Sequence, residues 1–153
     1  MSIKTKISIE RKVEIEKIAK EKGADLLQQK FIEAAMELDA SIVEPFIPED
    51  MMLQDFDKYR FLVFLKDMFD SIWHKHPENY RVELANFQCS NCNFKKPLAG
   101  FEVFAGEELK AFERFAFYVE TDDNGTTKDI YICNYFHRKE NEHKVHKDDF
   151  MYF

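Results

Sequence analysis

Residues 111–136 read AFERFAFYVETDDNGTTKDIYICNYF, and they have the pattern of two β-strands joined by a tight turn. Large apolar side chains recur at alternate positions within 111–120 and again within 129–136, which is the period of a strand with one buried face. Between them, TDDNG at 121–125 favours a turn, because Asn and Gly tolerate positive φ. One face of the first strand carries Phe115, Phe117 and Val119, and one face of the second carries Ile130 and Ile132.

Two further strands are predicted before this hairpin. Tyr80, Val82 and Leu84 alternate with charged residues, and residues 100–105 contain another short apolar run. Because the connections between successive strands are short, an antiparallel meander is the economical topology.

The first half of the chain has a helical period instead. Apolar residues recur at three- and four-residue spacing in 7–21, 24–38 and 57–74, which predicts three helices. Asp57 is placed to cap the third helix. Residues 40–46 predict one or two more helical turns, and residues 51–53 predict a small strand. We expect the apolar face of the third helix to contain Tyr59, Leu62, Val63, Leu65, Phe69 and Trp73.

These patterns predict one α+β domain over residues 1–153, with N-terminal helices packed on a curved antiparallel sheet. A chain of 153 residues has a usual length for a single domain and buries enough surface to fold without a disulfide or a metal. Within it we expect a helical extension at 1–23, an α+β core at 24–136 and a charged tail at 137–153.

The segments FIEAAMELD at 31–39 and IVEPF at 42–46 are followed by the long predicted helix and then by the meander. This order resembles that of the nuclear-transport-factor-2-like superfamily of cone-shaped domains, in which an opening helix leads into a short acidic loop. The resemblance implies a deep apolar pocket between sheet and helices, and homodimers formed through the outer face of the sheet. It implies no chemistry, because this fold carries enzymes, binding modules and transport factors alike.

Cys89 and Cys92 form the one motif with the spacing of metal ligands. Two cysteines separated by two residues can bind one metal ion from a tight turn, because both sulfurs then point to one side. A structural zinc site needs four ligands, and no second pair with this spacing occurs. The sequence therefore favours a loop with two free thiols and no cofactor, with a zinc site and a redox dithiol as alternatives. Further zinc ligands would be His74, His76 or His137, or would come from a second subunit.

Charge and composition restrict the class of partner. The formal net charge is −7 and no long basic run occurs, so we expect no nucleic-acid binding. No apolar stretch approaches the roughly 20 residues that span a bilayer, and the N-terminus has no secretory signal pattern, so no membrane association is expected. Three cysteines, an odd number, favour a reducing compartment, and we expect a cytoplasmic location.

Aromatic residues make up 15% of the chain and support two interpretations of its interior. Rings on inner faces form a packed core, and in a cone they can also line an apolar pocket. The residues predicted to line the pocket are Phe31, Tyr59, Trp73, Phe115, Phe117, Tyr131 and Asn134.

The acidic residues at 49–57 have no base, nucleophile or metal ligand near them in sequence, so we interpret them as a helix start and a solvated loop.

The sequence contains no recognisable catalytic constellation. It favours a non-catalytic domain that binds a small apolar ligand or a protein and forms a homodimer through its sheet. One alternative is an enzyme of the isomerase or dehydratase type, which would need an acidic or histidine side chain deep in the pocket. The other is a metal-stapled interaction module built on Cys89 and Cys92. A filled cone would count against any ligand inside it.

Overall fold

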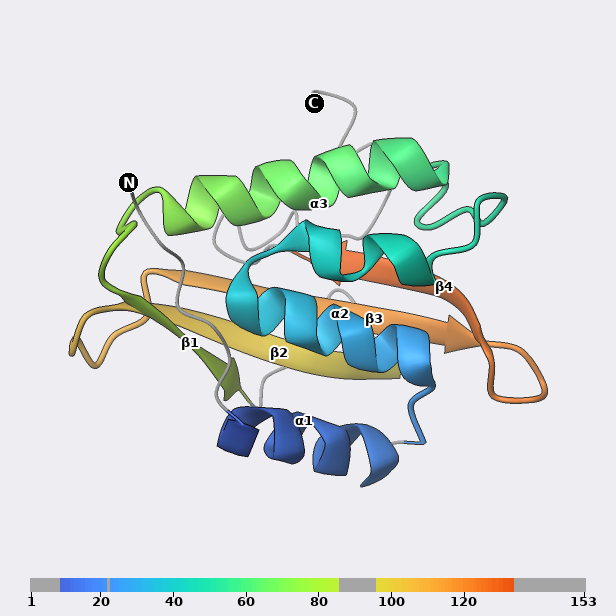
Figure 1. Cartoon of the computed structure of the whole chain (residues 1–153), viewed down its shortest axis with the longest axis horizontal. Coiled ribbons are helices and arrows are strands. Elements are labelled where there is room, and N and C mark those ends of the chain that lie inside the picture. Colours follow the sequence, from blue (N-terminus) through green and yellow to red (C-terminus); the bar gives the residue numbers. More distant parts are fainter. Residues whose placement is uncertain (1–8, 22, 86–95, 134–153) are drawn as a thin grey trace.

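The computed structural model describes residues 9–21, 23–85 and 96–133, with helices in the first half and a sheet in the second (Figure 1). The predicted α+β class is confirmed. The helical elements are α1 (Ile9–Glu21), α2 (Leu26–Glu37), η1 (Ala40–Ile42), η2 (Glu44–Phe46) and α3 (Lys58–Trp73). The strands are β1 (Tyr80–Ala85), β2 (Lys96–Ala105), β3 (Glu113–Thr121) and β4 (Thr127–Cys133).

The four strands form one antiparallel sheet in the order β1-β2-β3-β4, which confirms the predicted meander. Phe101 of β2 lies opposite Phe115 of β3, and Phe117 of β3 lies opposite Ile132 of β4. These four side chains share the face of the sheet that is turned toward the core. The period-2 pattern of the sequence therefore identified the inner face of β3 and β4 correctly.

The turn between β3 and β4 forms where the sequence predicts it. Gly125 has a φ of 81°, in the left-handed region that glycine adopts without strain. The Asp122 carboxylate accepts hydrogen bonds from the backbone N–H groups of Asn124 and Thr126, at 2.9 and 3.0 Å. Asp122 lies at the start of the turn, and its side chain thus stabilises the turn, as short polar side chains do in tight turns.

Each of the two core helices begins at an aspartate. The Asp25 side chain accepts a hydrogen bond from the backbone N–H of Gln28, and Asp57 accepts one from that of Arg60. Both bonds satisfy an N–H group that has no partner within the first turn of the helix. The predicted cap at Asp57 is confirmed.

Phenylalanine rings fill the layer between the helices and the sheet. α2 and α3 lie over the same face of the sheet (Figure 1). Phe31 of α2 meets Phe117 edge-to-face with ring centroids 5.5 Å apart, and Phe101 stacks on Phe115 at 5.1 Å. All four residues are fully buried. Burial of one such side chain contributes roughly 1.5–3 kcal/mol, so these four rings together make a large contribution to the stability of the fold.

The buried face of α3 differs from the predicted one. Leu65 and Phe69 are buried as expected, but Tyr59 and Val63 are 77% and 43% exposed. Tyr59 and Val63 are four residues apart and therefore share one side of the helix, which here faces solvent. The core-facing residues of α3 are Phe61, Phe64, Leu65, Met68, Phe69 and Ile72.

Residues 51–53 do not form the predicted strand. Leu53 and Phe56 instead exchange two backbone hydrogen bonds of 2.9 Å across a two-residue turn. The residues of this turn, Gln54 and Asp55, have φ values of 53° and 67°. Positive φ at both positions is the geometry of the turns that close tight hairpins. The segment folds back on itself and adds no strand to the sheet.

Candidate functional site

Three of the predicted pocket residues lie together in the core. Phe31, Phe115 and Phe117 are fully buried. The Phe117 ring lies 5.5 Å from that of Phe31 and 5.8 Å from that of Phe115, measured between centroids. Rings at these distances touch one another, so they occupy the space between α2 and the sheet.

The other predicted pocket residues lie elsewhere. Tyr59 is exposed on the solvent side of α3, and Trp73 is half-buried at the end of the same helix. Tyr131 lies on the outer face of the sheet, where it packs against the buried residues Ala116, Tyr118 and Cys133. The pocket role of Asn134 and the zinc site stay predictions, since the described residues do not include Asn134, Cys89 and Cys92.

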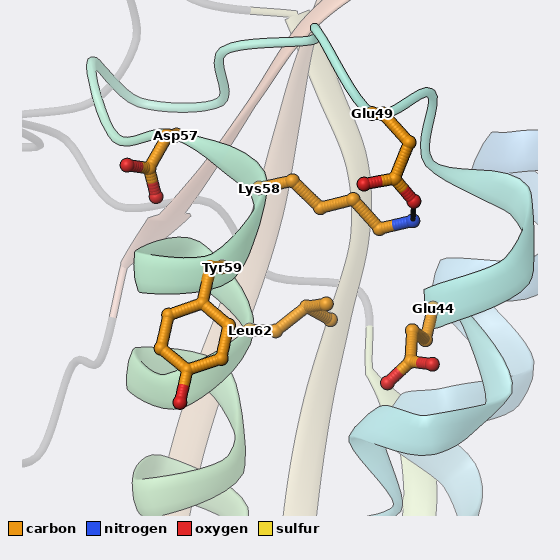
Figure 2. Close-up of a pocket in the computed structure, with 6 residues that line it drawn as sticks. All are labelled: Glu44, Glu49, Asp57, Lys58, Tyr59 and Leu62. Atoms are coloured by element: carbon orange, nitrogen blue, oxygen red, sulfur yellow. Dashed lines mark hydrogen bonds and ion pairs between the residues drawn. The ribbon is translucent and has the colours of Figure 1, made fainter.

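A hollow of about 460 Å³ opens at the surface between η2 and the first turns of α3 (Figure 2). It is concave enough to receive one side chain or a small polar molecule. Its wall is mainly polar and charged, unlike the apolar pocket expected from the sequence. The lining residues are Glu44, Glu49, Asp57, Lys58, Tyr59 and Leu62.

Two local features position the residues that line the hollow. Pro45 lies in the first turn of η2, a position that suits its fixed φ, and this turn carries Glu44. Asp57 begins α3 as its N-cap. The first two turns of α3 then carry the remaining helical members of the wall (Figure 2), which are Lys58, Tyr59 and Leu62.

The Lys58 ammonium pairs with Glu49 across the hollow. Lys58 Nζ lies 3.0 Å from Glu49 Oε1, a contact drawn as a dashed line in Figure 2. The Lys58 side chain is 13% exposed, whereas that of Glu49 is 92% exposed. An ion pair with one such exposed partner contributes only about 0–1 kcal/mol, so Glu49 can exchange this contact for another cation.

Negative charge is in excess in the hollow. Among the described residues that line it, three carboxylates, of Glu44, Glu49 and Asp57, stand against one ammonium, that of Lys58. The exposed Tyr59 ring and the half-buried Leu62 side chain add an aromatic and an aliphatic surface. Carboxylates next to an exposed ring suit an organic cation that has an apolar stem. Among the described residues, no group of three His, Cys, Asp or Glu side chains is arranged to hold a metal ion.

A second polar cluster lies on β4. The Asp129 carboxylate accepts hydrogen bonds from the backbone N–H groups of Gln54 and Ile130, at 2.7 and 2.8 Å, and one from the Tyr131 hydroxyl. Burial raises the pKa of Asp129 above its ordinary value, although these hydrogen bonds act in the opposite direction. Burial, and then the negative charge of Asp129, raise the pKa of the Tyr131 hydroxyl. The cluster joins the turn at Gln54 to β4.

Glu113 is a buried acidic side chain on the inner face of the sheet. Its side chain is 1% exposed, and its Oε2 accepts a hydrogen bond of 2.8 Å from Lys75 Nζ. Lys75 follows directly after the end of α3, so the pair ties that end of the helix to β3. A buried charge needs such a partner to offset the loss of its hydration.

The hollow has no signature in the sequence, because its lining residues, which all lie within 44–62, differ in type and follow no regular spacing. Glu49 and Asp57 appeared as part of a solvated loop and a helix start, and neither Glu44 nor Lys58 was singled out. The only usable sequence signal was the helix cap at Asp57, which places the following lysine on the first turn of α3. Nothing in the local pattern brings that turn next to η2.

Comparisons with known proteins gave no match. No family model matches the sequence, and none of the curated proteins or solved structures compared with the chain matches it. Among the described residues, every helix is too short or too polar to cross a bilayer.

Proposed function

We propose that this chain is a non-catalytic binding domain that takes an arginine side chain of a partner protein into the hollow at the start of α3. The observation that carries the proposal is the excess of carboxylates beside an exposed aromatic ring in one concave surface. Arginine offers a planar cation to the carboxylates and an alkyl stem to the apolar part of the wall. Hydrogen bonds between guanidinium and carboxylate are roughly twice as strong as neutral ones.

Within this proposal, Glu49 is the main acceptor and Tyr59 the stacking surface. Glu49 is exposed and pairs with Lys58 across the hollow, so a guanidinium can share its second oxygen or replace the ammonium. Tyr59 is 77% exposed, which leaves a ring face for a cation. A cation over such a ring gains about 0.5–1 kcal/mol at an exposed site.

An NMR titration of the full chain tests the proposal, with the peptide acetyl-Gly-Arg-Gly-amide as the probe. We expect saturable shifts of backbone amide signals confined to residues 44–62, with a dissociation constant on the order of 1 mM, which corresponds to about −4 kcal/mol. The matched peptide acetyl-Gly-Glu-Gly-amide should produce no saturable shift. Shifts of equal size with both peptides would rule out recognition of a cation.

Two variants of the same ion pair, Glu49→Gln and Lys58→Met, give opposite expectations. Glu49→Gln removes an acceptor and should weaken binding of the arginine peptide several-fold. Lys58→Met removes the competing ammonium, keeps the buried stem, and should tighten binding by a similar factor. Both changes should alter the free energy of unfolding by no more than about 1 kcal/mol. Weaker binding by Lys58→Met would contradict the proposed role of the hollow.

A relation to the nuclear-transport-factor-2-like superfamily belongs to this proposal as well. It is supported by the order of elements, with helices first and a four-stranded antiparallel meander after them. A homodimer through the outer face of the sheet is proposed on two partly exposed aromatic side chains there, Phe104 and Tyr131, and it would have to form around Ala116, Tyr118 and Cys133, which are already buried within one chain. Both statements remain proposals alongside the arginine site.

An acid–base enzyme is the second candidate, because Glu113 is a buried carboxyl group on the inner face of the sheet. A substrate would have to displace Lys75 from Glu113 and open a side chain that is 1% exposed. A small apolar ligand inside the domain would have to displace the mutually packed rings of Phe31 and Phe117. Both requirements favour the surface hollow over the interior as the binding site.

A further inference from the structure

Residues 31–57 carry a concentration of negative charge that includes the carboxylates of the hollow. The segment contains eight Asp and Glu residues and no Lys or Arg, so it carries −8 against −7 for the whole chain. None of the eight acidic residues is buried. Glu44 and Glu49 lie on the η2 side of the hollow and face α3 (Figure 2). A surface with this excess of one sign attracts a segment of the opposite sign.

A segment of opposite charge follows β4 in the sequence. Residues 137–147, HRKENEHKVHK, contain four Lys and Arg residues against two Glu residues, and also three histidines. We call residues 137–147 the basic segment. Four of the five arginines in the chain lie in the described helices and strands, at positions 11, 60, 81 and 114. Arg138, in the basic segment, is the one arginine outside the described residues.

The chain leaves β4 beside the segment that leads into α3. The Ile132 N–H donates to Gln54 Oε1 at 3.1 Å, and Gln54 Nε2 donates to the Ile132 carbonyl at 3.5 Å. Gln54 is fully buried, and its own N–H donates to Asp129 Oδ1 at 2.7 Å. These hydrogen bonds hold the end of β4 against Gln54, which comes four residues before Lys58 in the sequence.

Arg138 is within reach of the hollow from this point. It lies six residues after Ile132, and an extended chain of six residues spans about 20 Å. Gln54 and Lys58 are four residues apart, which is at most about 14 Å along the chain. A tether of a few residues gives an effective concentration on the order of millimolar. This concentration is similar to the dissociation constant on the order of 1 mM that we expect for a single arginine.

We propose that the basic segment is an internal ligand of the hollow, with the Arg138 guanidinium bound at Glu44 and Glu49 of the same chain. The inference rests on the proposed function, because it takes the hollow to be an arginine site, and it adds how that site is regulated. An arginine of a partner has to displace Arg138 before it can bind. Because these charge pairs form at an exposed site, added salt weakens the internal contact.

Backbone amide NMR signals of the full chain test the internal contact without any added peptide. We expect Arg138→Gln to shift signals of residues 44–62 as well as those of its own neighbours in sequence. Lys110→Gln removes the same charge from an exposed position in the loop between β2 and β3, and it should leave the signals of residues 44–62 unchanged. That loop lies near the C-terminal end of α3, whereas the hollow lies at its start (Figure 1).

Titration with acetyl-Gly-Arg-Gly-amide separates this inference from the proposed function. Arg138→Gln should bind the peptide several-fold more tightly than wild type, because it lacks the competing guanidinium. Equal affinity of the two chains would overturn the inference and leave the proposed function standing. Binding to neither chain would refute the proposed function, and the signals of residues 44–62 alone would then decide the inference.

Two results of the measurement without peptide count against the internal contact. Identical signals of residues 44–62 in wild type and Arg138→Gln would show that the hollow does not hold Arg138. A change of these wild-type signals on dilution would assign the contact to a second copy of the chain, which also overturns the inference. Arg138→Lys keeps the charge but lacks the planar fork of donors, so its signals should fall between those of wild type and Arg138→Gln.

Discussion

Replacement of Asp25 by alanine removes one carboxylate that serves two elements far apart in the chain. Asp25 Oδ1 accepts a hydrogen bond of 2.9 Å from the backbone N–H of Gln28 at the start of α2. Asp25 Oδ2 accepts bonds of 2.8 and 2.6 Å from the backbone N–H and the hydroxyl of Thr127 at the start of β4. The Asp25→Ala variant therefore tests whether this tie contributes to the stability of the fold beyond its role as a helix cap.

The expected loss of stability follows from these contacts. Removal of an N-cap side chain costs about 1 kcal/mol. Thr127 is only 8% exposed, so its backbone N–H would be left buried and unsatisfied, which costs about 1–3 kcal/mol more. We expect Asp25→Ala to lower the free energy of unfolding by about 2–4 kcal/mol.

Urea unfolding followed by far-ultraviolet circular dichroism measures this loss. With a slope of about 2 kcal/mol per molar urea for a chain of this size, the midpoint should fall by roughly 1–2 M. Asp57→Ala is the matched control, because Asp57 caps α3 through one exposed bond to Arg60. It should lower the midpoint by only about 0.5 M. Equal losses in the two variants would refute the reasoning that the tie to Thr127 stabilises the fold.

Two more predictions concern the core and the pH dependence of stability. Phe117→Ala should lower the free energy of unfolding by about 3–5 kcal/mol, because it leaves a cavity among Phe31, Phe101 and Phe115; a loss below 1 kcal/mol in urea unfolding would show that this layer is loosely packed. Wild type should gain stability relative to Asp129→Asn as the pH falls from about 7 to 4, because burial raises the pKa of Asp129 and the folded chain then binds the proton more readily than the unfolded chain. This gain is lost again as the pH rises through the raised pKa of Asp129. Urea unfolding curves at several pH values measure it, and a difference in free energy of unfolding between wild type and Asp129→Asn that stays constant with pH would contradict the raised pKa.

The hairpin at β3 and β4 was predictable because its signals are local. The alternation at Phe115 and Phe117 and the turn at Gly125 act between residues close in sequence, and the structure follows them. The helix α3 was predictable for the same reason, but its buried face was not. Tyr59 and Phe61 are both aromatic, and only the position of the sheet decides which of them is covered.

The hollow could not be derived in the same way. Glu44, Glu49 and Lys58 come from segments whose separation depends on how η2 and α3 pack on the core. The sequence shows a cap at Asp57 and charges nearby, which fit a solvated loop equally well. The hollow exists because η2 and the start of α3 lie side by side, and no periodic pattern in the sequence predicts that they do.

By itself, the sequence determined the class of the fold, the order of the three helices and the four strands of the sheet, and the places where a helix and a turn form, as at Asp57 and Gly125. These features depend on contacts within a few residues, whose geometry the backbone sets. Only the tertiary structure decided which apolar side chains are buried and which side chains join distant segments of the chain. Asp25 reaches Thr127 across 102 residues, and Gln54 reaches Ile132 across 78. Contacts at such separations depend on the packing of the whole core, so they have no signature in the local sequence.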